Sequence, residues 1–175
     1  MREKLKLMIE IALMAGLAFV LGMIKFSGLW AQGGSVSLIM LPIFLVSFRH
    51  GLKAGLLTGL LTGCLDLLGG YVVHPLQMFL DYPLAYMLVG LAGIYSQDKE
   101  NKDILKHSNI YKGVALGSLG RLLSHFLSGV VWFGIYAPEG MPIIAYSLFY
   151  NLSYLILEVI IVIIVLRNLP WRRLN

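Results

Sequence analysis

Six ionisable residues interrupt strongly apolar stretches of the sequence: Glu10, Asp66, Asp81, Arg121, His125 and Glu158. A charge inside a hydrocarbon core is costly, so such residues usually face a cavity or one another. A carboxylate among aromatic rings suits an organic cation, which gains from Coulomb attraction and from cation–π contact. Asn and Tyr side chains add directional hydrogen bonds to a heterocycle. These residue types therefore predict a pocket for a small cationic ligand.

Helical spacing gathers polar and aromatic residues on two faces, because intervals of three and four residues return to the same side of a helix. The first face comprises Arg121, His125, Ser128 and Trp132. The second comprises Ser147, Asn151, Tyr154 and Glu158, with Tyr146 and Tyr150 at its edge. We expect both faces to border one pocket, in which Gly129 leaves room for a ring.

Structural roles are open alternatives for the same residues. Asp81 and Arg121 could pair with each other, and His125 could bond a backbone carbonyl. Tyrosines near the ends of apolar runs are common interfacial anchors. We expect structural roles for Glu10 and Glu158, which lie toward the opposite half of their predicted helices from the other polar groups.

The elements that position these residues are predicted membrane spans. Of the 175 residues, 58% are hydrophobic and 13% are charged, against about half and about a quarter in soluble domains. Apolar runs suited to crossing a bilayer cover residues 5–24, 36–48, 54–69, 76–95, 113–135 and 142–166. The second run is short and contains Pro42. We predict an all-α integral membrane protein with a single six-helix membrane domain over residues 1–175.

Basic residues fall on one side of this predicted topology. Twelve of the 14 Lys and Arg residues lie at the N-terminus, in the joints after spans two and four, or in the C-terminal tail: Arg2, Lys4, Lys6, Arg49, Lys53, Lys99, Lys102, Lys106, Lys112, Arg167, Arg172 and Arg173. The opposite joints hold only Lys25, and Arg121 lies within a span. Cytoplasmic loops are enriched in Lys and Arg, so both termini and a linker over residues 97–112 are predicted to be cytoplasmic.

The same census excludes several classes of function. The cations form no continuous stripe of the kind that binds nucleic acid. With Cys64 as the one cysteine, neither a disulfide framework nor a multi-cysteine metal site is possible, and we expect no metal. Gly51, Gly55, Gly59 and Gly63 recur at every fourth residue and predict a close helix-packing seam. The loop over residues 26–35 contains Trp30 and is expected to fold over the pocket as a lid.

Eight separated motifs occur in order along the chain: EIA at 10–12, WAQGGS at 30–35, PI at 42–43, FRHGL at 48–52, FLDY at 79–82, SHFLSG at 124–129, YAPEG at 136–140 and AYSLFYN at 145–151. Together they resemble the thiamine-specific substrate-binding component of energy-coupling-factor transporters, a family of six-helix membrane proteins. The resemblance covers most of the chain and implies a binding subunit in the plasma membrane of a prokaryote, which captures thiamine at the extracellular face.

That resemblance also implies roles for individual residues. Asp81 would face the thiazolium charge and the aminopyrimidine, Tyr82 would line the pocket, and Trp30 would close the lid. Tyr146 and Asn151 would bond the pyrimidine, and His125 would bracket the rings with an aromatic residue at the end of its helix. The implied ligand-binding set is Trp30, Asp81, Tyr82, Arg121, His125, Gly129, Trp132, Phe133, Tyr146 and Asn151.

Three positions depart from the family pattern. Members often have Glu where this chain has Asp81, and one pattern has Lys and Trp where this chain has Arg121 and Phe133. The neighbouring Trp132 is therefore a second candidate for the stacking role.

The resemblance implies partners as well. They are a transmembrane coupling subunit and two ATP-binding subunits, and small residues on the first helix, Ala12, Ala15 and Gly16, would pack against the coupling subunit. The sequence holds no Gly-x-x-x-x-Gly-Lys-Ser/Thr phosphate loop, so we expect ATP to be used by the partner subunits and no cofactor to be bound by this chain.

Three other functions stay open on the sequence. The first is a binding subunit of the same fold for riboflavin, biotin or a thiamine precursor. The second is an intramembrane enzyme in which His125 acts with Asp81 or Asp66 as acid and base. The third is an autonomous channel or carrier, against which stands the lack of visible inverted repeats.

Overall fold

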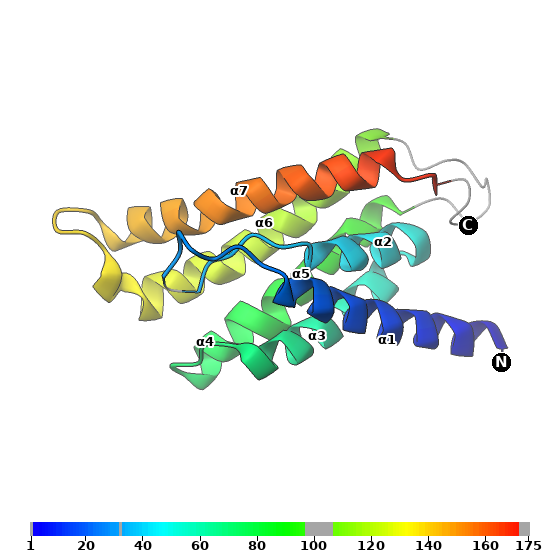
Figure 1. The fold of residues 1–175 in the computed structure, drawn as a ribbon, viewed down its shortest axis with the longest axis horizontal. Coiled ribbons are helices and arrows are strands. Elements are labelled where there is room, and N and C mark those ends of the chain that lie inside the picture. Colours follow the sequence, from blue (N-terminus) through cyan, green and yellow to red (C-terminus); the bar gives the residue numbers. More distant parts are fainter. Residues whose placement is uncertain (1, 32, 97–106, 172–175) are drawn as a thin grey trace.

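The computed structural model describes residues 2–31, 33–96 and 107–171, and in this part of the chain the regular elements are all helical (Figure 1). The predicted all-α class is confirmed. The helices are α1 (Arg2–Met23), α2 (Met40–His50), α3 (Leu52–Asp66), η1 (Leu67–Gly69), α4 (Pro75–Phe79), η2 (Leu80–Leu84), α5 (Ala85–Val89), η3 (Gly90–Tyr95), α6 (His107–Trp132), η4 (Gly134–Tyr136) and α7 (Ile143–Asn168).

Five helical segments of the described residues are long and apolar enough to cross a membrane: Arg2–Met23, Leu52–Gly69, Pro75–Tyr95, His107–Trp132 and Ile143–Asn168. The second predicted run differs most from expectation, because α2 begins at Met40 rather than at residue 36. Residues 24–39 are largely irregular, and Phe26 and Val36 form an antiparallel bridge with N–O distances of 3.0 and 2.9 Å. At ~1.5 Å per residue, α2 is about 16 Å long.

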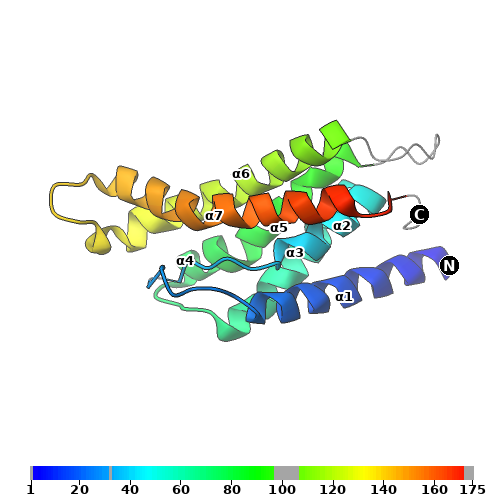
Figure 2. The same cartoon turned by 45° about the horizontal axis from the view of Figure 1, so that its top comes forward.

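The two ends of the helix bundle differ in which parts of the chain lie there. α1 begins and α7 finishes at one end of the molecule, whereas the connections over residues 24–39, 70–74 and 133–142 lie at the other (Figures 1 and 2). We call these the termini end and the loop end. The predicted linker over 97–112 falls partly outside the described residues, and 107–112 belong to the first turns of α6.

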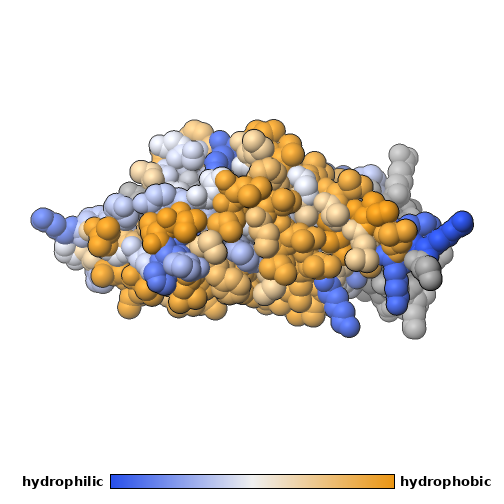
Figure 3. All heavy atoms as spheres, turned by 90° about the horizontal axis from the view of Figure 1, so that it is seen from below, coloured by the Kyte–Doolittle hydropathy of each residue, from blue (hydrophilic) through white to orange (hydrophobic). Residues whose placement is uncertain are grey.

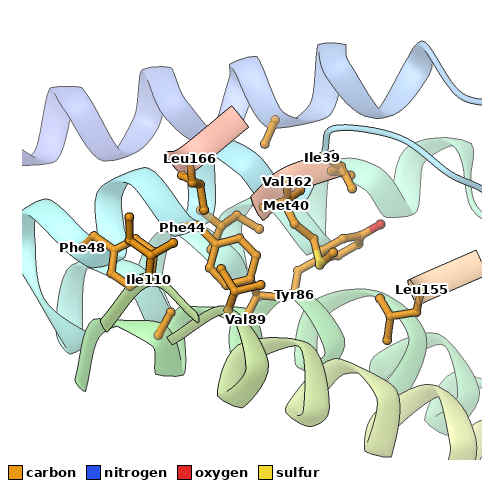
Figure 4. Close-up of a cluster of buried hydrophobic side chains, with 14 of the residues drawn as sticks. Ile39, Met40, Phe44, Phe48, Tyr86, Val89, Ile110, Leu155, Val162 and Leu166 are labelled. Carbon is orange, nitrogen blue, oxygen red and sulfur yellow. The ribbon is translucent and has the colours of Figure 1, made fainter. Parts of the chain in front are cut away.

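The apolar core surrounds α2 (Figure 4). Phe44 and Phe48 on this helix are fully buried and stack with ring centroids 6.2 Å apart. Around them lie Val89, Ile110 and Leu166, all 0–1% exposed. Burial of this kind stabilises by about 25 cal/mol per Å² of apolar surface where water is the alternative solvent, and by close packing where lipid is. α2 is therefore short but central.

Glycines let α3 pack directly on the backbone of the following segment. A Cβ atom at Gly59 would collide with the carbonyl oxygen of Tyr86, and one at Gly63 would lie 2.7 Å from the Cα atom of Pro83. Close backbone contact of this kind is how helices associate where the solvent is lipid. The packing seam predicted from the four-residue glycine repeat is confirmed, and it fixes the segment that carries Asp81 against α3.

α1 is the most peripheral of the long helices. Its most apolar window is 22% buried, compared with 39% for Pro75–Tyr95. Apolar side chains cover most of one face of the molecule, and strongly hydrophilic ones gather toward the termini end (Figure 3). Glu10 ties α1 to the end of α2 through an ion pair with Arg49 and a 3.0 Å contact to Nε2 of His50. This pairing fits the structural role expected for Glu10.

Candidate functional site

A cavity of about 120 Å³ lies at the loop end, between the loop over residues 24–39 and the helices η1, η2, α6 and α7. It combines carboxylates, phenol rings, a guanidinium group and a histidine. The predicted ligand-binding residues that line it are Asp81, Tyr82, Arg121, His125, Gly129, Phe133, Tyr146 and Asn151. The segments that supply them are far apart in sequence, so the cavity depends on the packing of the whole bundle.

Asp81 reaches the cavity from an irregular turn of helix. It lies in η2, a π-helical turn that interrupts the segment Pro75–Tyr95 and contains Pro83. Proline lacks a backbone N–H and clashes with the preceding turn, so a regular α-helical hydrogen-bond ladder cannot continue through it. Such π turns recur at functional sites. Here the turn points Asp81 at α6, with 14% of its side chain exposed.

Three side chains converge on the Asp81 carboxylate. Gln77 Nε2 and Ser128 Oγ both donate to Oδ2, at 2.7 and 2.8 Å. His125 Nδ1 lies 3.1 Å from Oδ1. An ionised carboxylate only accepts hydrogen bonds and has about four lone-pair sites. The three contacts therefore fill three of the four sites of an ionised Asp81 at the cavity wall, which leaves capacity for one further donor.

Arg121 orients the His125 ring and favours one of its tautomers. The Arg121 Nε–H group donates to His125 Nε2 across 3.2 Å. Because arginine stays protonated in proteins, Nε2 must accept, and the histidine proton must lie on Nδ1. His125 then donates that proton to Asp81. The hydrogen-bond network thus favours the tautomer of His125 whose Nδ1–H points at Asp81.

Arg121 and Asp81 do not pair directly, contrary to one alternative left open by the sequence. Arg121 Nη1 instead donates to Glu158 Oε2 at 2.7 Å, in a pair whose side chains are 6% and 0% exposed. Glu158 Oε1 also accepts from Ser37 Oγ at 3.1 Å. This buried pairing fits the structural role expected for Glu158, because α7 packs along α6 and presents it to Arg121.

Asp66 is the second carboxylate of the cavity wall, and Tyr86 connects it to Arg121. Tyr86 donates its hydroxyl to Asp66 Oδ2 at 3.0 Å. The Arg121 guanidinium carbon lies 4.8 Å from the centre of the Tyr86 ring, within cation–π range. Arg121 is therefore enclosed by an aromatic face and Glu158, while Asp66 contributes a further negative charge to the cavity wall.

Tyrosine rings form much of the remaining wall. Tyr146 and Tyr150 pack with centroids 5.8 Å apart. The Tyr82 hydroxyl accepts from the backbone N–H of Tyr71 at 2.7 Å, so it anchors the connection between η1 and α4. Such rings supply apolar faces together with polar edges.

Phe133 and Trp132 occupy different places. Phe133 lines the cavity, whereas Trp132 stacks on His74 with centroids 5.2 Å apart. α6 ends at Trp132, but the Phe133 N–H still donates to the Gly129 carbonyl at 3.1 Å. Phe133 therefore lies one helical turn after Gly129, on the face that lines the cavity, whereas Trp132 does not line it.

The side chain of Trp30 packs between its own loop and α7, and it does not line the cavity. It is 7% exposed, its indole N–H donates to Ser153 Oγ at 2.7 Å, and its ring meets Tyr154 edge-on. Beside it, the backbone N–H of Gly34 donates to the Tyr150 hydroxyl at 3.2 Å, and Gly34 lines the cavity. In this structure Trp30 fastens the loop to α7.

Gly129 allows α6 to pack closely against α7 at this site. A Cβ atom there would collide with Ser147 Oγ and lie 3.4 Å from Asn151 Nδ2. The expected room for a ring is thus taken by α7 itself. Asn151 is held by its own helix, because Nδ2 donates to the Ser147 carbonyl at 2.8 Å and Oδ1 accepts from Tyr154 at 2.6 Å.

The sequence matches the thiamine transporter protein family over residues 8–175. This chain belongs to that family. It is 41% identical over 174 residues to the thiamine transporter ThiT of Bacillus subtilis (strain 168), which covers 94% of this chain and 90% of that protein. It is 32% identical over 136 residues to ThiT of Lacticaseibacillus paracasei, which covers 72% of this chain and 68% of that protein.

A solved structure of ThiT from Listeria monocytogenes has the same architecture, with a TM-score of 0.80, 28% identity and 98% of each chain covered. The resemblance inferred from the motifs is therefore confirmed for the thiamine transporter family. Membership in this family, together with the long apolar helices, makes the chain a bacterial membrane protein. Within residues 2–31, 33–96 and 107–171, no group of three or more His, Cys, Asp or Glu side chains is placed to hold a metal ion.

Sequence reasoning missed two members of the polar network. Gln77 lies one helical turn before Asp81, and that four-residue spacing was the available signal. Besides bonding Asp81, its Nε2 donates to the Tyr71 carbonyl at 3.1 Å and its Oε1 accepts from the Val73 N–H at 3.0 Å. Ser37 offered no such signal, since it lies in the irregular loop before α2.

The three small residues of α1 do not share one environment. Ala12 is exposed, and a Cβ atom at Gly16 would meet nothing within 4 Å, so both lie on the outward face. Ala15 is 1% exposed and packs inside the bundle. Its assignment to a partner interface is therefore corrected, because one residue's step along a helix turns the side chain by about 100°.

Proposed function

We propose that this chain is a substrate-binding subunit that takes up thiamine in the loop-end cavity. The observation that carries the proposal is the Asp81 carboxylate, held as an anion by Gln77, Ser128 and His125 on a wall of aromatic rings. A desolvated carboxylate of this kind attracts the permanent positive charge of a thiazolium. Tyr146 and Asn151 lie across the cavity and supply hydrogen-bonding groups for the pyrimidine.

We propose six membrane crossings, with α2 as the shortest, in a single domain whose termini are cytoplasmic. The charge distribution supports this orientation. The described cations at the termini end are Arg2, Lys4, Lys6, Arg49, Lys53, Lys112 and Arg167, whereas Lys25 lies toward the loop end. Since positive charge is retained on the cytoplasmic side, the cavity would open outward.

Uptake would require partners, which we propose are a transmembrane coupling subunit and two ATP-binding subunits. The outward face of α1 supports this, because Ala12 and Gly16 leave its backbone open to another helix. Purified chain in liposomes should bind thiamine without accumulating it, and ATP-driven uptake should need the added subunits. Accumulation by the chain alone would favour an autonomous carrier.

A thiamine titration of the detergent-purified protein tests the binding proposal. Thiamine should change the intrinsic tryptophan fluorescence, since Trp30 packs against Tyr154 of the cavity wall and Trp132 precedes Phe133 of that wall. Asp81→Asn should weaken binding by at least about tenfold, because a charge-assisted contact contributes about 1.5–3 kcal/mol. Glu10→Gln, which removes a carboxylate outside the cavity, is the matched control and should bind normally.

Competition decides between vitamins. Excess riboflavin or biotin should leave binding of labelled thiamine unchanged, and displacement by either would assign the cavity to that vitamin. We also propose that His125 binds rather than catalyses, because its Nε2 is already occupied by Arg121. Recovery of unaltered thiamine by mass spectrometry after prolonged incubation is the expected result, and a new product would contradict it.

A further inference from the structure

Glu158 is a buried carboxylate directly behind the cavity wall. It is 0% exposed and is not among the lining residues, yet its two partners, Arg121 and Ser37, both line the cavity. Removing a carboxylate from solvent costs free energy, which its pairing must offset. The charge of Glu158 can therefore act on the cavity through these two partners.

The charged side chains that line the cavity balance one another. Asp66 and Asp81 contribute two negative charges, and Lys25 and Arg121 contribute two positive ones. Without Glu158 the wall would be neutral. With Glu158 paired to Arg121 at 2.7 Å, the cavity and its immediate surroundings carry one net negative charge. That sum matches a ligand with one positive charge.

The hydrogen bonds give the same result locally. Arg121 contacts His125, and His125 contacts Asp81, so the guanidinium lies two hydrogen bonds from the carboxylate that faces the ligand. Glu158 holds Arg121 from the other side. Without Glu158 as its partner, the Arg121 guanidinium would be attracted to the Asp81 carboxylate and would compete with the ligand for it. The reason is that an unpaired buried charge is strongly destabilised.

We propose that Glu158 is a specificity-determining residue: by neutralising Arg121, it reserves Asp81 for a monocationic ligand and disfavours neutral and phosphorylated forms of the same ligand. This rests on the proposed thiamine function of the cavity. Glu158 acts through Arg121 and touches no ligand, so its effect is on the ratio of affinities between ligands of equal shape and different charge.

The test compares three ligands on the wild type and Glu158→Gln. They are thiamine, its neutral isostere in which a thiophene replaces the thiazolium, and thiamine monophosphate. Glutamine keeps the shape and one acceptor oxygen, so it removes chiefly the charge. The wild type should prefer thiamine to the neutral isostere, and in Glu158→Gln this preference should fall by about tenfold or more. The relative affinity for the monophosphate should rise.

Glu10→Gln is the matched control, since it removes a carboxylate paired with an arginine at the other end of the bundle. It should leave the preference within about twofold of wild type, because a distant charge that water can reach is screened. A double variant, Arg121→Gln with Glu158→Gln, removes both charges of the buried pair. Its preference for the cation should stay within about threefold of wild type, even where overall affinity drops.

The outcomes separate this inference from the function on which it rests. Failure of the wild type to bind thiamine overturns both. Normal thiamine binding, with an equal loss for all three ligands in Glu158→Gln, makes Glu158 structural and overturns this inference alone. If Glu158→Gln does not fold, the double variant carries the test, and a folded double variant that has lost its preference for the cation overturns the proposal.

Discussion

In the described residues, two arginine–glutamate pairs join helices of this bundle, and they differ in burial. Arg121 and Glu158 join α6 to α7 beside the cavity, with side chains 6% and 0% exposed. Arg49 and Glu10 join α2 to α1 toward the termini end, with side chains 26% and 28% exposed. The first pair belongs to a continuous hydrogen-bond network that includes Ser37. Within the described residues, Glu10 of the second pair also contacts His50.

The comparison teaches that the same two residue types can serve different ends. A buried pair is sensitive to the loss of one partner, which leaves an uncompensated charge and costs about 3–5 kcal/mol. A pair that water can reach contributes about 0–1 kcal/mol. The pair beside the cavity therefore fixes charge and geometry, whereas the other adds a modest tie to the peripheral helix α1.

The largest expected effect comes from Glu158→Leu, which leaves Arg121 charged and buried. We expect a loss of about 3–5 kcal/mol in the free energy of unfolding, measured by chemical or thermal denaturation in detergent. The double variant Arg121→Met with Glu158→Leu should recover most of that loss, because an apolar pair of similar volume can replace a buried ion pair. A single variant as stable as the wild type would show that the pair is not buried as described.

An intermediate effect is expected at the cavity itself from Gln77→Leu. This change removes the 2.7 Å donor to Asp81 and the bonds to the backbone of Tyr71 and Val73. Thiamine binding should weaken by about tenfold, and stability should fall by about 1–3 kcal/mol, the cost of leaving buried groups unpaired. Calorimetric titration and denaturation measure the two. Unchanged binding with lowered stability would restrict Gln77 to holding the loop.

The sequence predicted those features of the site and the fold that depend on helical periodicity. The spacing of Arg121, His125 and Ser128 placed them on one face, and the structure brings His125 and Ser128 to Asp81. The glycine repeat likewise predicted the seam at Gly59 and Gly63, because close backbone approach needs no partner to be specified. Position on a helix face is a local property, so it can be read from spacing alone.

Pairing between helices and breaks in helices could not be read in this way. The spacing placed Glu158 on the polar face of α7 but not at the height of Arg121. Pro83 was an available signal of a distorted helix that the prediction did not use, and the π turn that aims Asp81 also lies against α3. The choice between Phe133 and Trp132 stayed open because they are neighbours at the end of α6, and helix ends are poorly fixed by sequence.

The smallest effect is expected from Glu10→Gln, which tests the other side of the comparison. The amide can still accept one hydrogen bond from Arg49, and both cationic partners lie at 23–26% side-chain exposure, where water can replace the lost charge. We expect stability to change by no more than about 1 kcal/mol. Thiamine affinity should stay unchanged, because Glu10 does not line the cavity. Denaturation and titration of the same preparation measure both, and a loss as large as that of Glu158→Leu would mean that the two pairs are energetically alike despite their difference in burial.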